Sequence, residues 1–314
     1  MRVLRSDGTA LTLPRSTRTL PEMSKVPRDY SYSGAFNQTE FQRAYAEEFK
    51  GVPKTNLAST PDLLFLLGKV GADPRITDIR WSAYILATAF IESSHTVRIT
   101  KESISKKGRV RSHKIKVWRN FSPIEEAGHG KGKGYQLPVK VLRLPSGDAQ
   151  VTEYDGEQWK VLAATGSARP LHPEQDRGVD AHTKASPVYT KDDGEEEYFF
   201  GRGYVQLTWW NSYAAAGVAL GRGLAFLFAP DLVDDPEVAY SILATGLCTG
   251  GIFANGRRLS QYFHGGHTDY VGARNMVNAG AKHANKVEVG DIAKRFERVL
   301  LGSRVAPAVV SRLG

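Results

Sequence analysis

The first residue that could do chemistry stands at the end of an apolar run. The stretch ILATAFIESSHT, residues 85–96, is apolar for almost two helical turns and then presents the carboxyl group of Glu92. Burial and the negative end of the helix dipole both disfavour a charge there, which predicts a raised pKa for Glu92. A carboxyl group that keeps its proton near neutral pH can act as a general acid. The ordinary alternative is a glutamate that faces water at a frayed helix end.

A second stretch, YFFGRGYVQLTWWNSYAAAG at residues 198–217, combines glycines, polar side chains and aromatic rings. The two glycines that flank Arg202 allow a tight turn and the close approach of a ligand. The alternation of Tyr204, Gln206 and Thr208 with apolar residues predicts an extended segment with one polar face. Aromatic surface that could stack on sugar rings or bases follows at Trp209, Trp210 and Tyr213. The alternative is a strand-to-helix junction with ordinary core aromatics.

Together these stretches resemble the signature of glycoside hydrolase family 19, which contains chitinases and phage endolysins with a lysozyme-like fold. The resemblance covers roughly residues 60–100 and 198–300, and its motifs come in the family's order. The matching segments are FIESS at 90–94, FFGRGYVQLT at 199–208, FAPDLVDDPEVAYSILATGLCTGGIF at 228–253 and DYVGARNMVNAG at 269–280.

The chain also departs from that family pattern. Ile91 stands where a histidine usually precedes the first glutamate. The arginine that often follows the last motif is absent, and Lys282 or Lys286 could replace it only as a point charge. Residues 101–197 are longer than the family's usual second lobe and match it poorly, so substrate contacts in that region are not implied.

The resemblance implies hydrolysis of a β-1,4 bond between N-acetylated amino sugars, with Glu92 as the acid. A second carboxylate would activate water from the opposite face, and inversion of configuration needs about 6.5–9.5 Å between the two groups. Glu102 is the first choice, because related endolysins place their second carboxylate about ten residues after the first. Glu125 and Glu126 are the alternatives, at a spacing closer to that of plant chitinases. Each of the three could instead be a surface glutamate that balances nearby lysines.

The same resemblance implies a set of substrate-binding side chains. Gln206 and Thr208 would hold the water or an N-acetyl group by hydrogen bonds, and Arg202 would orient a carboxylate or a backbone turn. No cofactor is expected, and the histidines lack the spacing of a metal site. Cys248 lies in an apolar segment and is expected in the core. The full predicted binding set is Arg202, Tyr204, Gln206, Thr208, Trp209, Tyr213 and Asn278.

The surrounding pattern predicts the elements that position these residues. Helical periodicity follows a cap at Asn37, Thr60 with Pro61 in the first turn, and Thr77 or Asp78. Alternating and β-branched stretches over 97–165 predict one small antiparallel sheet. The expected fold is α+β, predominantly α-helical and lysozyme-like, with an inserted β lobe. The expected parts are an extended arm (1–35), a helical part (36–100), a basic β-rich insertion (101–197) and a second helical part (198–314).

Composition limits the class of protein. The chain has 314 residues, a net charge of +9 and a sequence pI of about 9.5, which predicts attraction to a polyanion. Residues 101–140 hold eleven Lys or Arg against three Asp or Glu. No apolar run is long enough to span a membrane, the N-terminus has no signal-peptide core, and Cys248 is the single cysteine. We therefore expect synthesis in the cytoplasm, with delivery by a holin or a secretion machine.

Three functions are compatible with these observations. The first is a peptidoglycan-cleaving muramidase that acts on the bacterial cell wall, because a basic surface suits an anionic wall polymer. The second is a chitinase with the same catalytic residues. The third belongs to another class: a nucleic-acid binder that uses the 101–140 patch and the Trp209–Trp210 pair for stacking.

Overall fold

The computed structural model describes residues 29–32, 35–104, 110–136, 139–154, 159–164, 183–184 and 195–305. Within these ranges the fold is mixed α+β and mostly helical, with antiparallel sheets, as the sequence predicted at this coarse level. Most of the predicted N-terminal arm (1–35) lies outside the described residues. No described helix combines the length and the hydropathy that are needed to cross a membrane.

The helices begin where the sequence supplies capping side chains. Asn37 accepts a hydrogen bond from the amide of Glu40 (3.1 Å), and Asp78 accepts one from Arg80 (2.9 Å), so both predicted caps are confirmed. Thr60 is the first helical residue rather than the cap. The helices are α1 (Gln38–Glu48), α2 (Thr60–Ala72), α3 (Ile79–Glu92), α4 (Trp210–Ala219), α5 (Ala225–Phe228), α6 (Pro236–Thr249), α7 (Tyr270–Ala273) and α8 (His283–Ser303).

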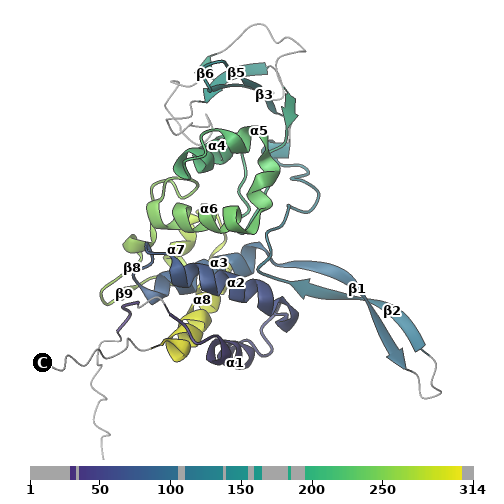
Figure 1. Cartoon of the computed structure of the whole chain (residues 1–314), viewed down its shortest axis with the longest axis vertical. Coiled ribbons are helices and arrows are strands. Elements are labelled where there is room, and N and C mark those ends of the chain that lie inside the picture. Colours follow the sequence, from purple (N-terminus) through teal and green to yellow (C-terminus); the bar gives the residue numbers. More distant parts are fainter. Residues whose placement is uncertain are drawn as a thin grey trace, which may run out of the picture.

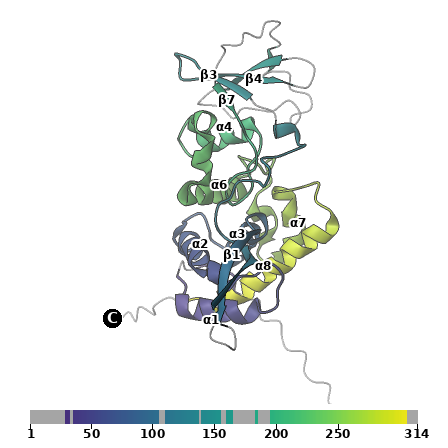
Figure 2. The ribbon, with the colours of Figure 1, turned by 90° about the vertical axis from the view of Figure 1, so that its right-hand side faces the viewer.

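Helix α3 runs through the centre of the helical body, as Figures 1 and 2 show. Every residue from Ile79 to Phe90 except Trp81 is buried, which confirms the predicted buried helix. Its C-terminal end packs into an aromatic cluster with α1 and α8, where the ring centroids of Phe90 and Phe121 lie 5.7 Å apart. Phe49 and Phe296 complete this cluster at 4.7 Å from each other. Because Phe90 precedes Glu92 by only two residues, the cluster fixes the end of α3 from which Glu92 projects.

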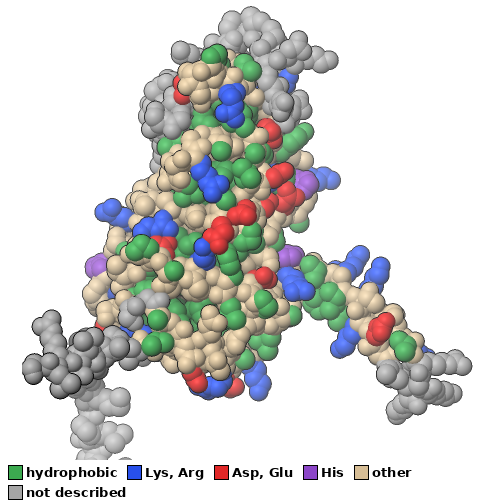
Figure 3. Space-filling model, in the orientation of Figure 1, with side chains coloured by type: hydrophobic (Ala, Val, Ile, Leu, Met, Phe, Trp, Pro, Cys, Tyr) green, Lys and Arg blue, Asp and Glu red, His purple; other side chains and the backbone are tan. Residues whose placement is uncertain are grey.

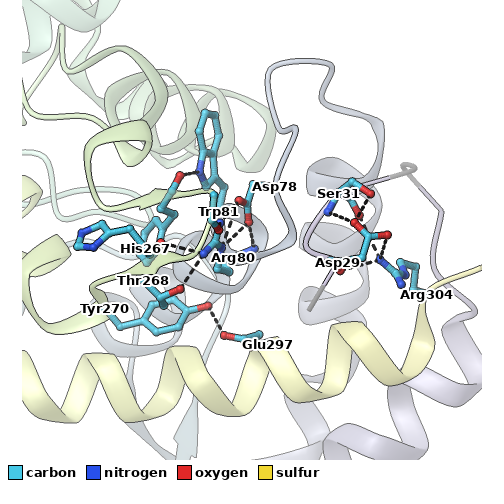
Figure 4. Close-up of polar contacts among 12 residues, drawn as sticks. Asp29, Ser31, Asp78, Arg80, Trp81, His267, Thr268, Tyr270, Glu297 and Arg304 are labelled. Carbon is cyan, nitrogen blue, oxygen red and sulfur yellow. Dashed lines mark hydrogen bonds and ion pairs between the residues drawn. The ribbon is translucent and has the colours of Figure 1, made fainter. Parts of the chain in front are cut away.

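The start of α3 is held by a buried arginine (Figure 4). Arg80 is bound by Asp78, with Nη2 2.5 Å from Oδ2, and it donates to Thr268 Oγ1 (2.7 Å) and to the carbonyl oxygen of His267 (2.8 Å). Tyr270, two residues further along, donates to Glu297 of α8 (2.9 Å). A charged hydrogen-bond network of this kind is costly to break, because each buried polar group would lose its partner. Arg80 therefore holds the start of α3 against the segment at His267 and Thr268, and the Tyr270–Glu297 bond holds α7 against α8.

The β region forms two separate units rather than the single predicted sheet. Strands β1 (His95–Ile104) and β2 (Val110–Arg119) make a hairpin that projects from the helical body (Figure 1). The other unit is a five-stranded antiparallel sheet in the order β6-β5-β4-β3-β7, beside α4 and α5. Its strands are β3 (Val139–Arg143), β4 (Ala149–Tyr154), β5 (Trp159–Ala164), β6 (Thr183–Lys184) and β7 (Glu195–Glu197), and a small hairpin is formed by β8 (Phe263–His264) and β9 (His267–Thr268).

The alternation of polar and apolar residues predicts strands but does not show which strands pair, so it could not distinguish the β1–β2 hairpin from the five-stranded sheet. Within the described residues, β1 and β2 pair only with each other, from His95 opposite Arg119 to Ile104 opposite Val110. The PSGD segment at 145–148 forms the turn that joins β3 to β4, with Gly147 at a φ of 87°. The three consecutive glutamates at 195–197 form strand β7, which pairs with β3 at the sheet edge. Most of 166–194 lies outside the described residues.

Candidate active site

Glu92 is the last residue of α3, and its side chain is only 16% exposed. Nη2 of Arg274 lies 2.5 Å from its Oε1 atom. Burial raises the pKa of Glu92 above its usual value, and the nearby positive charges of Arg274 and, more weakly, Lys54 act in the opposite direction. The predicted direction of this pKa shift is therefore confirmed. The main cause is burial, so Glu92 holds its proton to a higher pH than an exposed glutamate.

Arg274 contacts Glu92 and also supports one wall of a cavity. Its guanidinium is buried, and Nε donates to Oδ1 of Asn285 (3.1 Å). Its carbonyl oxygen accepts from the amides of Val277 (3.1 Å) and Asn278 (2.9 Å). Among the described residues, Oε1 of Glu92 and Nη1 of Arg274 are buried atoms without an aligned hydrogen bond. Seven other buried side-chain atoms of the described residues share this condition, including the hydroxyl oxygens of Tyr45 and Thr88, so it does not by itself mark the site.

The wall that Arg274 supports belongs to a cavity of about 250 Å³. Four of the predicted binding residues line it together: Gln206, Thr208, Trp209 and Asn278. Residues 205–209 and 277–279 are far apart in the sequence, so only the tertiary fold brings them to one cavity. Further lining residues are Val205, Leu207, Ser212, Ile252, Phe253, Asn255, Val277 and Ala279.

The backbone around this cavity is strained. Six described non-glycine residues have positive φ angles, and three of them line the cavity: Gln206 (54°), Trp209 (69°) and Asn255 (49°). Such conformations cost about 1–3 kcal/mol each and cluster at ligand-binding sites. They also show that one prediction was wrong. Residues 202–207 form a tight turn closed by two hydrogen bonds between Arg202 and Leu207 (2.9 and 3.2 Å), not an extended segment with one polar face.

Glu126 lies against the same turn. Its Oε1 accepts from the hydroxyl of Tyr135 (3.1 Å), and its Oε2 accepts from the amide of Gly201 (3.3 Å). Its own amide donates to the carbonyl oxygen of Gly201 (2.7 Å). A Cβ atom on residue 201 would lie 2.9 Å from Oε1 of Gln206 and 3.3 Å from Cβ of Glu126, so any larger residue would have to displace these side chains.

Tyr135 connects Glu126 to the cavity wall. Its ring meets the ring of Trp209 edge-on, with the centroids 5.6 Å apart. Partial burial, assisted by the adjacent negative charge of Glu126, raises the pKa of Tyr135 to about 12. The tyrosine therefore keeps its proton over the ordinary pH range and remains a hydrogen-bond donor to Glu126. On the same turn, Nε2 of Gln206 donates to the carbonyl oxygen of Ile124 (2.9 Å), which places the two stretches side by side.

The segment before Glu126 is tied to the residues after Glu92. Oγ of Ser93 accepts from the amide of Phe121 (2.8 Å), and Oγ of Ser94 accepts from the side-chain amide of Asn120 (2.6 Å). Five residues separate Phe121 from Glu126, which is at most about 17 Å of extended chain. The hairpin that intervenes in the sequence therefore leaves its two ends in contact, and the chain from Phe121 to Glu126 sets the reach between the two glutamates.

Glu102 lies elsewhere. It is exposed on β1, opposite Ser112, seven residues beyond the start of the strand at His95. At about 3.3 Å per residue it stands about 23 Å out along the projecting hairpin. The structure does not bring it together with Glu92. The ten-residue spacing would place a second carboxylate near the first only in a compact loop, and here those residues form a long strand.

Three predicted binding residues lie behind the cavity wall. Arg202, Tyr204 and Tyr213 are buried. The guanidinium of Arg202 forms ion pairs with Glu125 (3.3 Å) and Asp231 (3.0 Å), and it donates to the carbonyl oxygen of Tyr198 and to the hydroxyl of Tyr213. These contacts hold the turn from the inside. Glu125 faces this arginine and His129 (3.4 Å), with its side chain 45% exposed.

Sequence reasoning missed two residues of the site. Arg274 stands four positions before Asn278 in the segment DYVGARNMVNAG, whereas the predicted replacements for the family arginine were the lysines after that motif. Of those, Lys286 binds Oδ1 of Asn275 (2.6 Å) and the carbonyl oxygen of Ala279 (3.1 Å). Tyr135 lies within the basic segment 101–140, and it had no predicted role. In both cases the sequence offered a clue: a polar residue without a predicted role stood inside a segment that the sequence analysis had singled out.

Within the described ranges, no group of three or more His, Cys, Asp or Glu residues is arranged to hold a metal ion. Compared with protein-family models, curated proteins and solved structures, the chain gives no match. The described site therefore comprises a buried carboxyl group with a raised pKa, a second carboxylate beside the 202–207 turn, and a polar cavity that is lined by neither glutamate.

Proposed function

We propose that the chain is a peptidoglycan-degrading glycoside hydrolase, a muramidase with a lysozyme-like arrangement, that cleaves β-1,4 bonds between N-acetylated amino sugars. The observation that carries this proposal is Glu92, a buried carboxyl group with a raised pKa whose arginine partner supports the wall of a polar cavity. A group of this kind suits the general acid of glycoside hydrolysis. The net charge of +9 favours an anionic wall polymer over neutral chitin.

In the proposed reaction, the carboxyl group of Glu92 gives its proton to the glycosidic oxygen as the bond to the sugar C1 breaks. Glu126 accepts a proton from water while that water attacks C1 from the opposite face. The products are two shorter glycans, and the configuration at C1 is inverted. Glu126 replaces Glu102 as the preferred second carboxylate, because its oxygens already meet donors on the turn beside the cavity.

The cavity residues have distinct proposed roles. Trp209 offers an aromatic face to a sugar ring, and Thr208 and Asn278 offer hydrogen bonds to hydroxyl or N-acetyl groups. Gln206 is held by the carbonyl oxygen of Ile124, so its side-chain oxygen remains directed toward Gly201 and Glu126. Arg202 supports this turn from behind and would act through it rather than on the substrate. The enzyme would act on the cell wall after delivery by a holin or a secretion machine.

The test is digestion of purified peptidoglycan, with the new reducing ends identified by mass spectrometry. The wild type should release muramic acid ends, and NMR should show the α-anomer as the first product. Glu92→Gln should release none, whereas Glu102→Gln, a matched change on the exposed hairpin, should match the wild type.

Other products would revise the proposal in defined ways. Glucosamine ends would show that a different bond of the glycan is cleaved. Turnover of chitin oligomers but not of peptidoglycan would make the protein a chitinase. Equal activity of wild type and Glu92→Gln would contradict the proposal entirely.

A further inference from the structure

The β1–β2 hairpin is a surface that the proposed hydrolytic site does not use. Each strand has ten residues, so the hairpin extends about 30 Å, and Figures 1 and 3 show it projecting from the body. In the described part of the chain, each strand packs extensively only against the other. Its base is pinned by Asn56, whose side-chain amide donates to the carbonyl oxygen of Trp118 (2.5 Å). Two-stranded hairpins are marginal on their own in water, so an uncovered one calls for a partner.

The charge on this hairpin is strongly one-sided. Its described strands carry six Lys or Arg side chains and one carboxylate, Glu102. Residues that are directly opposite share a face, so cations occur on both faces of the hairpin. Five of the six are exposed, and Arg119 at the base is partly buried. The cations are Arg98, Lys101, Arg111, Lys114, Lys116 and Arg119.

Apolar side chains are exposed between these cations. Ile99 is 37% exposed, Val110 61% and Trp118 37%. They are three of the seven large hydrophobic residues that are exposed in the described part of the chain, although the hairpin strands supply only twenty residues. Exposed apolar groups that gather on one element mark an interaction surface. Their mixture with cations is the composition of segments that bind the interface of an anionic membrane.

We propose that the hairpin is an arm that binds the surface of an anionic phospholipid bilayer. Lys and Arg side chains on both faces would meet lipid phosphates when the arm enters the headgroup layer end-on. Val110, at the far end of the described strands, would reach the boundary with the acyl chains, and Ile99 would follow it into the headgroup layer, whereas Trp118 stays at the base. Contacts with nucleic-acid phosphates would use the same cations but would gain little from isoleucine and valine. The inference stands apart from the hydrolytic function, because lipid binding needs no glycan.

The charge test uses the full chain and vesicles of phosphatidylglycerol and phosphatidylcholine, with pure phosphatidylcholine as the neutral comparison. Binding is measured by flotation at low and at physiological salt. The wild type should float with the anionic vesicles only. The variant Arg98→Gln/Lys101→Gln/Lys114→Gln/Lys116→Gln should bind about 10³-fold more weakly at low salt, since each of the four cations near such a surface contributes about 1 kcal/mol.

A matched variant removes four exposed cations from the helical body instead: Lys50→Gln/Arg222→Gln/Lys282→Gln/Lys294→Gln. It should bind within about threefold of the wild type. Equal losses in the two variants would overturn the proposal, because net charge alone would then explain the attraction.

The apolar test separates a bilayer from a nucleic acid. Ile99→Ser/Val110→Ser leaves every charge in place and should weaken vesicle binding about fivefold or more, whereas Leu57→Ser/Leu232→Ser, two exposed leucines on the body, should not. Binding of a fluorescent DNA duplex by the same variants is measured in parallel with vesicle binding. Unchanged vesicle binding by the hairpin variant, or tight duplex binding that only the hairpin cations support, would overturn the proposal. Circular dichroism of all four variants shows whether the body remains folded.

Discussion

The two glutamates of the site lie in contrasting surroundings. Glu92 ends a buried helix, its main partner is a buried arginine, and burial raises its pKa. Glu126 lies on an irregular segment and accepts hydrogen bonds from Tyr135 and from the amide of Gly201. Burial favours the protonated form of Glu92, whereas the surroundings of Glu126 supply two hydrogen-bond donors to its carboxylate oxygens. Pairs of carboxyl groups whose surroundings differ in this way can divide the roles of acid and base.

The change with the largest expected effect is Glu92→Gln. It keeps the shape and removes the titratable proton, so kcat on peptidoglycan should fall by about 10³–10⁴-fold with little change in KM. Turnover is measured by the release of reducing ends. A loss smaller than tenfold would mean that another group protonates the leaving oxygen.

Glu126→Gln should be the next most damaging change. Water activation would be lost while the acid remained, so kcat should fall by about 10²–10³-fold. Glu102→Gln on the hairpin is the matched control and should stay within about twofold of the wild type. Both variants are assayed with the same peptidoglycan preparation. If Glu102→Gln were the more damaging of the two, Glu102 would be the second carboxylate, as the ten-residue spacing predicted, and the proposed pairing of Glu92 with Glu126 would be wrong.

Replacement of Arg274 tests the electrostatic part of the comparison. Arg274 opposes the effect of burial, so Arg274→Met should raise the pKa of Glu92 further. Because Glu92 acts in its protonated form, activity is present below that pKa and declines as pH rises through it. The decline in kcat should therefore move to higher pH in this variant, and the maximal rate should fall by about tenfold. If the decline in kcat of Arg274→Met moved to lower pH instead, the assignment of Glu92 as the acid would be contradicted.

Tyr135→Phe should have the smallest effect. It removes one hydrogen bond to Glu126, a contribution of about 1 kcal/mol at a partly exposed site, so kcat should fall about fivefold. The edge-on contact with Trp209 is retained, and KM should change little. A loss as large as that of Glu126→Gln would show that the tyrosine itself takes part in proton transfer.

Much of the helical scaffold could be predicted from local pattern. The caps at Asn37 and Asp78 were correct, because a short polar side chain satisfies the first free amides of a helix whatever the tertiary context. The predicted sheet was partly wrong, because strand alternation does not state which strands pair. The predicted extended polar face at 204–208 was wrong as well. Positive φ angles at Gln206 and Trp209 turn that segment, and no local propensity predicts them for such residues.

The sequence by itself determined that Glu92 would end a buried helix, and therefore the direction of its pKa shift. Hydrophobic periodicity and a helix terminus are local properties, and burial follows from them. Only the tertiary structure decided which groups would surround that carboxyl. Arg274 comes from 182 positions later in the chain, and a hairpin carries Glu102 away while Glu126 lies against the turn beside the cavity. Contacts between distant segments depend on how packed elements are oriented, and residue spacing along the chain does not encode that orientation.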